Sequence, residues 1–256
     1  MINEPHPPGV DAEQHNREIH ENAKLWKAKP ILAKVYGEFY REVADRLDRS
    51  LKGLIVELGS GMGNAKSEIP DCITTDIFPN PWLDRVENAY ALSFLDGEVS
   101  NLILFDVWHH LEFPGTALRE FQRVLTTGGR LIILDPAMGL LGRLVYGRFH
   151  HEPLGVGEEI RWDAPEGFSP AEAPYFAAQA RASQIFESES YADQLTAWIR
   201  DEVTVWSALA YLGAGGFRGP QLYPEILLPV LRSADRILSL FPTIFGSRMI
   251  VVLSKK

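Results

Sequence analysis

The sequence of 256 residues contains one cysteine, Cys72, so it has no internal disulfide and suits a reducing compartment. It lacks any block of clustered lysine or arginine. Its 25 basic residues face 34 acidic ones, for a net charge of −9, which argues against a nucleic-acid-binding surface. No uncharged apolar run approaches the roughly 20 residues of a spanning helix, and the polar, proline-rich start has no signal-peptide pattern. These absences predict a cytoplasmic protein with no nucleic-acid partner and no stable membrane insertion.

Short apolar runs alternate with helical patterns in the first half of the chain. Four such runs are LIVEL (54–58), CITTD (72–76), NLILFD (101–106) and RLIIL (130–134). They are apolar at almost every position, which is typical of parallel strands buried on both faces. The segment TALREFQRVLTTGG, between the last two runs, has a helical stripe that ends at glycine. This alternation predicts an α/β fold with a doubly wound, mostly parallel sheet.

The predicted elements divide the chain into four regions. Residues 1–50 are predicted to form an N-terminal helical cap, interrupted at Pro30. Residues 51–138 carry the strand–helix alternation of the α/β core. Residues 139–200 are rich in proline, glycine, aromatic residues and glutamate, which indicates an inserted cap. Residues 201–256 are expected to complete the sheet with strands and an amphipathic helix. We expect this helix to cover the core rather than to lie on a membrane.

The stretch VELGSGMGN, residues 56–64, follows the first strand and has glycines at alternate positions, Gly59, Gly61 and Gly63. A strand followed by such a loop presents backbone N–H groups to a ligand. A dinucleotide fingerprint requires glycine at the sixth position of the loop, where this chain has Asn64. Glu57 is placed to hold a cationic amine, and its charge is unfavourable for a pyrophosphate.

An acid ends the second predicted strand. Asp76 follows Gly59 by 17 residues, close to the spacing of about 20 that is typical of nucleoside sites. A carboxylate at this position suits bidentate hydrogen bonding to ribose hydroxyls. Together with Glu57 it indicates a nucleoside that carries an amino acid and no diphosphate. S-adenosylmethionine fits that description.

Four motifs carry a family resemblance: VELGSGMG, TTDI, NAYALSFLDGEVSNLILFDVWHHL and FQRVLTTGGRLIILDP. In their order and spacing, over about residues 52–138, the sequence resembles the type 11 group of class I S-adenosylmethionine-dependent methyltransferases. The resemblance implies a seven-stranded, Rossmann-like methyltransferase fold with S-adenosylmethionine as cofactor. It also implies an enzyme that methylates a small molecule, and the cap composition favours a partly apolar one. The acceptor atom, oxygen, nitrogen or carbon, stays open, and the sequence does not indicate an oligomeric state.

The resemblance also implies cofactor-binding roles, position by position. The implied residues are Glu57, Gly59, Ser60, Gly61, Gly63, Asp76, Ile77, Asn88, Ala89 and Asp106. The glycine loop and Glu57 would hold the methionine part, Asp76 the ribose, and Asn88 the adenine amino group. Family members more often carry aspartate in place of Asn88, but the amide oxygen still accepts a hydrogen bond. Asp106 would end the fourth strand beside the methyl group.

Two histidine pairs are candidates for chemistry or substrate contact. His109 and His110 follow the fourth strand, so either is a candidate general base; the alternative is a scaffold that caps the turn or packs under the cofactor. His150 and His151, in FHHEP, are candidate substrate contacts in the cap. Together with Asp135 or Glu158 this second pair could suggest a metal site. We predict none, because side chains of adjacent histidines diverge in regular structure and catalytic zinc requires three ligands.

Aromatic residues of the N-terminal cap are further candidates for substrate contact. Tyr36 and Tyr40 lie on the apolar face of the second predicted helix, and the alternative for both is packing. Two rival functions are also considered. A non-catalytic S-adenosylmethionine-binding module would keep the same loop, and a nicotinamide-dependent oxidoreductase is disfavoured by Asn64 and Glu57.

Overall fold

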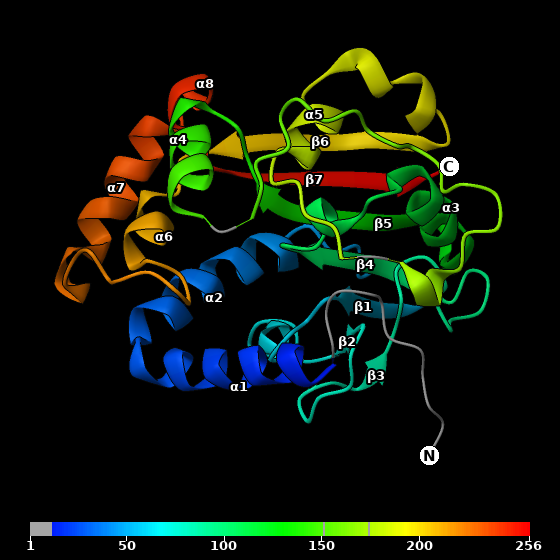
Figure 1. Ribbon diagram of the computed structural model, residues 1–256, viewed down its shortest axis with the longest axis horizontal. Helices are drawn as coiled ribbons and strands as arrows, with labels where there is room; N and C mark the ends of the chain where they lie inside the picture. Colours follow the sequence, from blue (N-terminus) through cyan, green and yellow to red (C-terminus); the bar gives the residue numbers. More distant parts are fainter. Residues whose placement is uncertain (1–11, 151, 174) are drawn as a thin grey trace.

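A computed structural model describes residues 12–150, 152–173 and 175–256 of the protein, in which one sheet is flanked by helices (Figure 1). The strands are β1 (Leu54–Leu58), β2 (Cys72–Asp76), β3 (Arg85–Val86), β4 (Val99–Phe105), β5 (Leu125–Pro136), β6 (Trp198–Trp206) and β7 (Arg248–Lys255). Their order in the sheet is β3-β2-β1-β4-β5-β7-β6. Pairing is parallel from β3 to β5, and β7 is antiparallel to both of its neighbours. The predicted seven-stranded, mostly parallel sheet is therefore confirmed.

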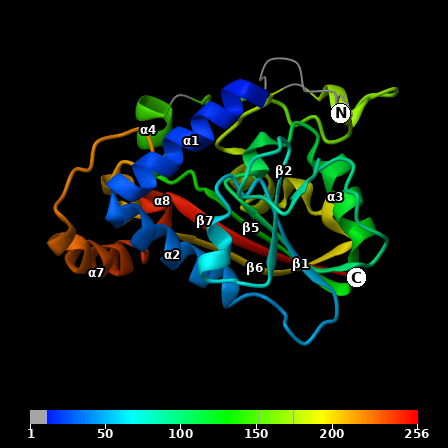
Figure 2. The same cartoon turned by 90° about the horizontal axis from the view of Figure 1, so that it is seen from below.

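Helices cover both faces of this sheet and its two ends. The α-helices are α1 (Ala12–Ala28), α2 (Pro30–Ala44), α3 (Pro114–Val124), α4 (Leu140–Phe149), α5 (Arg181–Phe186), α6 (Leu209–Ala214), α7 (Leu228–Leu238) and α8 (Pro242–Phe245). Short 3₁₀ turns include η1 (Asn64–Ser67) and η2 (Trp108–His110). Figure 2 shows α1 and α2, which contact each other, crossing in front of the sheet. Within the described ranges, no helix combines the length and apolar character needed to cross a membrane.

Alternate residues of the central strands pack into two separate cores. In β4, Leu102 and Leu104 join the cluster under α3 and α5, whereas Ile103 and Phe105 join the cluster under α2 and α6. Every residue of β4 is buried. Burial on both faces is why the sequence of this strand shows a continuous apolar run instead of an alternating one.

Several strands and helices begin and end where the sequence predicts. β1 and β2 coincide with the predicted runs, and α2 begins at Pro30, where a missing N–H is tolerated. The predicted amphipathic helix differs, because α7 ends at Leu238 and a separate short helix, α8, follows. Leu227 and Phe241 lie outside α7, and they are 44% and 53% exposed. Residues 1–11 of the predicted N-terminal cap lie outside the described residues.

The parallel strands end at a common edge of the sheet. The chain reverses its direction of progress across the sheet between β1 and β4, since β2 lies on one side of β1 and β4 on the other. Ligands of open α/β sheets bind outside the carboxyl ends of the strands at such a switch point. The loops after β1, β2 and β4 carry most of the candidate site residues.

Candidate active site

The loop after β1 requires glycine at its alternate positions. Gly59, Gly61 and Gly63 have φ angles of +68°, +52° and +68°, in the left-handed region. A Cβ atom at Gly59 would come within 2.2 Å of the Val107 side chain, and one at Gly63 within 2.9 Å of the Trp82 carbonyl oxygen. The bend therefore requires glycine at these positions. Because glycine has no side chain, a ligand can approach the backbone closely.

Asp76 touches this bend, as the sequence predicts for a nucleoside site. Its Oδ2 accepts a hydrogen bond from the Gly61 N–H at 3.0 Å, and its Oδ1 accepts one from the Ile77 N–H at 2.7 Å. Parallel pairing of β1 with β2 brings the two strand ends together. A carboxylate oxygen can accept more than one hydrogen bond, so a carboxylate at this position suits the hydroxyls of a ribose. Ser60, also buried, donates its hydroxyl to the Glu57 carbonyl oxygen.

Glu57 is a fully buried carboxylate, and neither of its oxygens has a hydrogen-bond partner among the described residues. Burial raises its pKa to about 7, although the approaching hydroxyls of Ser60 and Tyr40 oppose this rise. A buried carboxylate without a well-formed hydrogen bond is costly. A cationic amine at this point would satisfy it, so the residues present fit the amino-acid part of S-adenosylmethionine.

The residues predicted to contact adenine lie in a loop that is held by hydrogen bonds of the Asn88 side chain. The Asn88 side-chain amide donates to the Pro170 carbonyl oxygen at 2.9 Å, and its Oδ1 accepts from the Tyr90 N–H at 2.9 Å. Ala89 packs against the core under α3, and Ile77 is 36% exposed. The donor of Asn88 is thus committed to the segment 139–200, while its oxygen retains one lone pair.

Asp106, at the end of β4, is held in an unusual conformation by a buried arginine. Its φ of +56° is the one left-handed value at a non-glycine residue in the part of the chain that the structure describes. Its Oδ1 accepts a hydrogen bond from Arg248 Nη1 at 2.6 Å. Arg248 is 1% exposed and lies against the rings of Phe39, Phe105 and Tyr211.

His109 forms a buried pair with Asp135, the residue near the end of β5. The His109 Nδ1 and Asp135 Oδ1 atoms are 2.9 Å apart, and both side chains are buried. Burial by itself lowers the pKa of His109, but Asp135 and Glu152 outweigh it and raise this pKa to about 10. The pair therefore fixes the orientation of the ring. Because the raised pKa keeps the ring protonated at neutral pH, His109 is a poor proton acceptor.

His110 differs from its neighbour in both partner and charge. Its Nδ1 lies 2.9 Å from the Phe176 carbonyl oxygen, which can only accept, so Nδ1 carries the hydrogen and Nε2 the lone pair. Burial and the neighbouring charge of His109 lower the pKa of His110 to about 4. The imidazole is therefore uncharged at neutral pH and carries a lone pair on Nε2, although its low pKa makes it a weak base.

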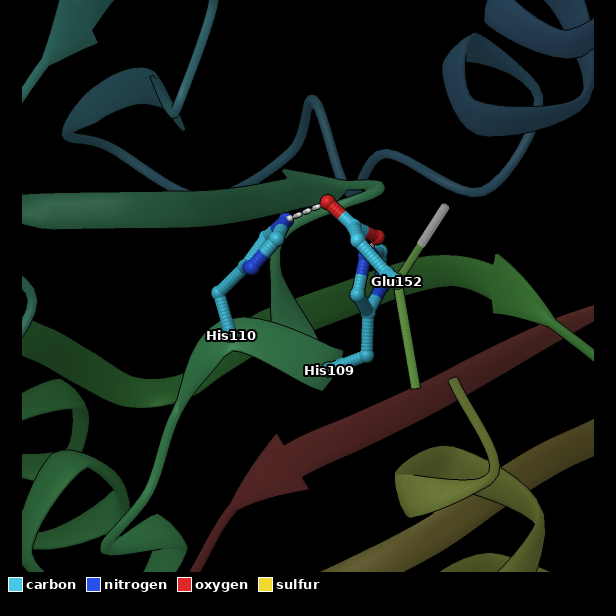
Figure 3. A group of neighbouring side chains, drawn as sticks. All are labelled: His109, His110 and Glu152. Atoms are coloured by element: carbon cyan, nitrogen blue, oxygen red, sulfur yellow. Dashed lines mark ion pairs between the residues drawn. The ribbon is translucent and has the colours of Figure 1, made fainter. Parts of the chain in front are cut away.

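Glu152, from the segment 139–200, faces both histidines (Figure 3). Its carboxylate oxygens lie 3.6 Å from His109 Nε2 and 3.8 Å from His110 Nε2. Tyr175 donates its hydroxyl to Glu152 at 2.7 Å, and Gln179 donates its side-chain amide. Burial raises the pKa of Glu152, but the histidines and Tyr175 lower it by more, so the carboxyl is ionised.

Sequence reasoning missed Glu152 and Asp135 as members of this cluster. Both had a usable signal, because Asp135 stands near the end of a predicted strand and Glu152 directly follows the second histidine pair. His150 Nδ1 lies 3.7 Å from a Glu152 oxygen, which places this candidate beside the cluster. His151 lies outside the described residues.

The two tyrosine candidates lie elsewhere, on α2. The rings of Tyr36 and Tyr40 contact Phe105, with centroids 5.5 Å and 4.9 Å away. Tyr40 is 5% exposed, and its hydroxyl approaches Glu57. The predicted substrate residues therefore fall into two places, one against the end of β4 and one at Glu152.

The loop after β4 links the glycine bend to the histidine cluster. Val107 packs against Gly59, and His109 follows two residues later. Polar atoms of Asp106, His109 and Asp135 lie within 4.8 Å of one another. The cluster and the bend therefore lie next to each other at the carboxyl edge of the sheet.

Comparison with known proteins agrees with this geometry. Residues 56–133 match the family described as the methyltransferase domain. No curated protein sequence matched the chain. Among solved structures, geranyl diphosphate C-methyltransferase from Streptomyces coelicolor A3(2), in complex with Mg²⁺, a substrate analogue and S-adenosyl-L-homocysteine, has 12% identity and a TM-score of 0.51. That match covers 86% of this chain and 76% of the other.

Two further solved structures show how widely this fold is used. A possible histamine N-methyltransferase from Thermotoga maritima has 16% identity and a TM-score of 0.51, over 94% of this chain and 98% of the other. The cyclase SpnF has 15% identity and a TM-score of 0.52, over 98% of both chains. At such identities the likeness shows the fold alone, and a cyclase among the matches shows that the fold does not determine the reaction.

The domain match and the site together define the class of protein. Residues 56–133 form a methyltransferase domain of the type 11 group of class I enzymes. The chain thus contains a methyltransferase domain, and S-adenosylmethionine is the cofactor that its glycine bend, Glu57 and Asp76 fit.

Proposed function

We propose that the protein transfers the methyl group of S-adenosylmethionine to a hydroxyl group of a small, partly apolar molecule. The supporting observation is the neutral imidazole of His110, whose Nε2 lone pair lies beside the Glu152 carboxylate at the edge where the glycine bend ends. Methyl transfer to a hydroxyl requires removal of one proton, and this pair offers an acceptor for it.

The cofactor would be held by residues of the first three strand ends. The bend 59–63 and the Glu57 carboxylate fit its methionine part, and Asp76 fits the ribose hydroxyls. Bound S-adenosylmethionine supplies a methyl group already activated by its sulfonium. The protein's own contribution is then to position the acceptor in line with that group, an effect worth up to roughly 7–11 kcal/mol.

His110 would take the acceptor's proton at Nε2 while its Nδ1–H stays on the Phe176 carbonyl oxygen. The resulting imidazolium would lie 3.8 Å from the Glu152 carboxylate, which stabilises its charge. As the proton leaves, the acceptor oxygen forms its bond to the methyl carbon and the carbon–sulfur bond breaks. His109 is a positioning residue in this scheme, since its ring is fixed by Asp135.

Segments outside the core would close the site against water. Ile19 of α1 lies against the bend, with its Cδ1 3.5 Å from where a Gly61 Cβ would be. The ring of His20 lies 5.1 Å from that of Trp82 on the adjoining loop. On the other side, Ala178 of the segment 139–200 donates its N–H to the His109 carbonyl oxygen at 2.9 Å. We propose that these two regions act as the caps of the acceptor site.

A panel assay with labelled S-adenosylmethionine and hydroxyl-bearing small molecules tests the proposal. We expect a product heavier by one methylene unit and release of S-adenosylhomocysteine. The variant His110→Gln should lower kcat by roughly 10²–10⁴-fold while leaving affinity for S-adenosylhomocysteine unchanged. Arg236→Gln, on the exposed face of α7, is the control. Full turnover in His110→Gln would contradict the role of this residue.

A non-catalytic binding module is the second candidate, because fold alone leaves turnover open. It predicts that the wild-type protein binds S-adenosylhomocysteine but methylates no member of any acceptor panel. The same assay therefore separates the two functions.

A further inference from the structure

The side chains of His109, His110 and Glu152 present three metal-binding atoms to one point. One nitrogen or oxygen of each lies within 4.8 Å of the others, and Figure 3 shows the three side chains converging. The carboxylate oxygens of Glu152 lie 3.6 Å and 3.8 Å from the two Nε2 atoms. Ligands bound tetrahedrally to zinc at about 2.0–2.1 Å are roughly 3.4 Å apart, so both contacts to Glu152 are close to the spacing that an ion requires.

Both histidines are already oriented as metal ligands are. The Nδ1 of His109 is held by the Asp135 carboxylate at 2.9 Å, and the Nδ1 of His110 by the Phe176 carbonyl oxygen at 2.9 Å. Metal-binding histidines usually donate their second ring N–H to a carboxylate or a backbone carbonyl, which fixes the tautomer and turns Nε2 to the ion. Here two different partners impose the same tautomer on both rings.

The carboxylate is held in a corresponding way. Tyr175 donates its hydroxyl to Oε1 of Glu152, and Gln179 donates its amide to Oε2. The three side chains are mostly buried, with Glu152 and His109 more deeply so than His110, so the ligands are shielded from competing water.

The sequence predicted no metal at the second pair, His150 and His151, because adjacent histidines diverge in regular structure. That reason does not apply at positions 109 and 110, because they lie on the 3₁₀ turn η2 and not in a strand or an α-helix. Their ring centroids are 4.1 Å apart, and the rings are inclined by 43°. Two neighbouring residues can therefore supply two ligands here.

A second group of potential ligands, Asp106, His109 and Asp135, is less suitable. It would use the ring nitrogen that His109 already directs to Asp135. A cation bound there would also compete with Arg248 for the Asp106 carboxylate, to which the guanidinium is bonded at 2.6 Å.

We propose that His109, His110 and Glu152 bind one divalent transition-metal ion, for which the His₂Glu set favours zinc. Three protein ligands leave a coordination position open for water or a substrate atom, as in catalytic zinc sites. Binding would displace any proton on Nε2 of His109. With the ion bound, Nε2 of His110 would be a ligand and no longer the proton acceptor of the proposed function, on which this last step rests. The open position would then receive the acceptor oxygen and lower its pKa as a Lewis acid does, and the proton would pass to water.

Metal binding is measured on the full chain without cofactor or acceptor, so its result is independent of methyl transfer. The protein is purified with a histidine-free affinity tag, stripped with a chelator and titrated with ZnCl₂ against a fluorescent chelator. We expect one equivalent of zinc with a dissociation constant in the micromolar range or below. Cobalt(II) in place of zinc should give the visible absorption of a low-coordinate site.

Variants identify the ligands. His110→Gln and Glu152→Gln should each weaken zinc binding by about 100-fold or more. Asp135→Asn, which alters only the support of His109, should weaken it by about 10–100-fold. His20→Gln, an exposed histidine on α1, should leave it unchanged. Circular dichroism and thermal unfolding establish that each variant is folded.

Two results would overturn the inference: no zinc uptake by the folded wild-type protein, or equal uptake by wild type and by the variant carrying both His110→Gln and Glu152→Gln. Activity is a separate readout. Methyl transfer by zinc-free protein would support the proposed function and show that it does not need the metal. Zinc binding without any methyl transfer would support the metal site and contradict the proposed function.

Discussion

Replacing Glu57 by glutamine removes a buried charge from beneath the glycine bend. Burial raises the pKa of Glu57 from its ordinary value of 4.5 to about 7. A raised carboxyl pKa contributes stability that is complete below about pH 4.5 and is lost as the pH rises through about 7. At 1.36 kcal/mol for each pKa unit, the wild-type protein without cofactor should lose about 3 kcal/mol of stability between pH 4.5 and pH 8 from this group. Glu57→Gln should lack that loss.

Urea unfolding at pH 5 and pH 8 measures the difference. We expect Glu57→Gln to be the more stable protein at pH 8, by up to about 3 kcal/mol, and to lose most of this advantage at pH 5. The variant should also bind S-adenosylhomocysteine more weakly, by roughly 10–150-fold, because a hydrogen bond to a charged group is worth about 1.5–3 kcal/mol. Glu159→Gln, an exposed carboxylate, is the control. The same pH dependence in wild type and Glu57→Gln would refute this account of Glu57.

Three other substitutions test the site. Asp76→Ala should weaken binding of S-adenosylhomocysteine at least 10-fold in calorimetric titration, since two hydrogen-bond acceptors for the ribose are lost. Gly59→Ala should destabilise the fold by at least about 1–2 kcal/mol in urea unfolding, because of its left-handed φ and the contact with Val107; wild-type stability would contradict the bend. Asp106→Asn should cost about 3–5 kcal/mol by leaving Arg248 buried and unpaired, and a neutral effect would show that the pair is dispensable.

The fold could be predicted from sequence where burial determines the pattern. β1 and β2 were located to the residue because strands buried on both faces leave unbroken apolar runs. The region after β5 gave no such signal, since its short helices and turns are held mainly by tertiary contacts. The end of α7 was missed for a related reason: the apolar residues beyond Leu238 continue the helical period, but the chain turns there into α8.

The candidate site was predictable where one local motif supplies the geometry. The contact between Asp76 and the bend followed from the order of two strands, a loop and an acid. The cluster around Glu152 was not predictable in this way, because His109 and Glu152 are 43 residues apart in sequence. What brings them together is the packing of Ala178 and Gln179 over the turn η2, which no periodicity reveals.

The central claim is that the bare bend after β1 and the carboxylates of Glu57 and Asp76 hold S-adenosylmethionine. A crystal structure of the protein with S-adenosylhomocysteine tests it most directly. We predict both ribose hydroxyls on Asp76 and the ligand's amine within hydrogen-bonding distance of Glu57, across the bend 59–63. A ligand bound elsewhere, or oriented with its adenine at Glu57, would contradict the claim.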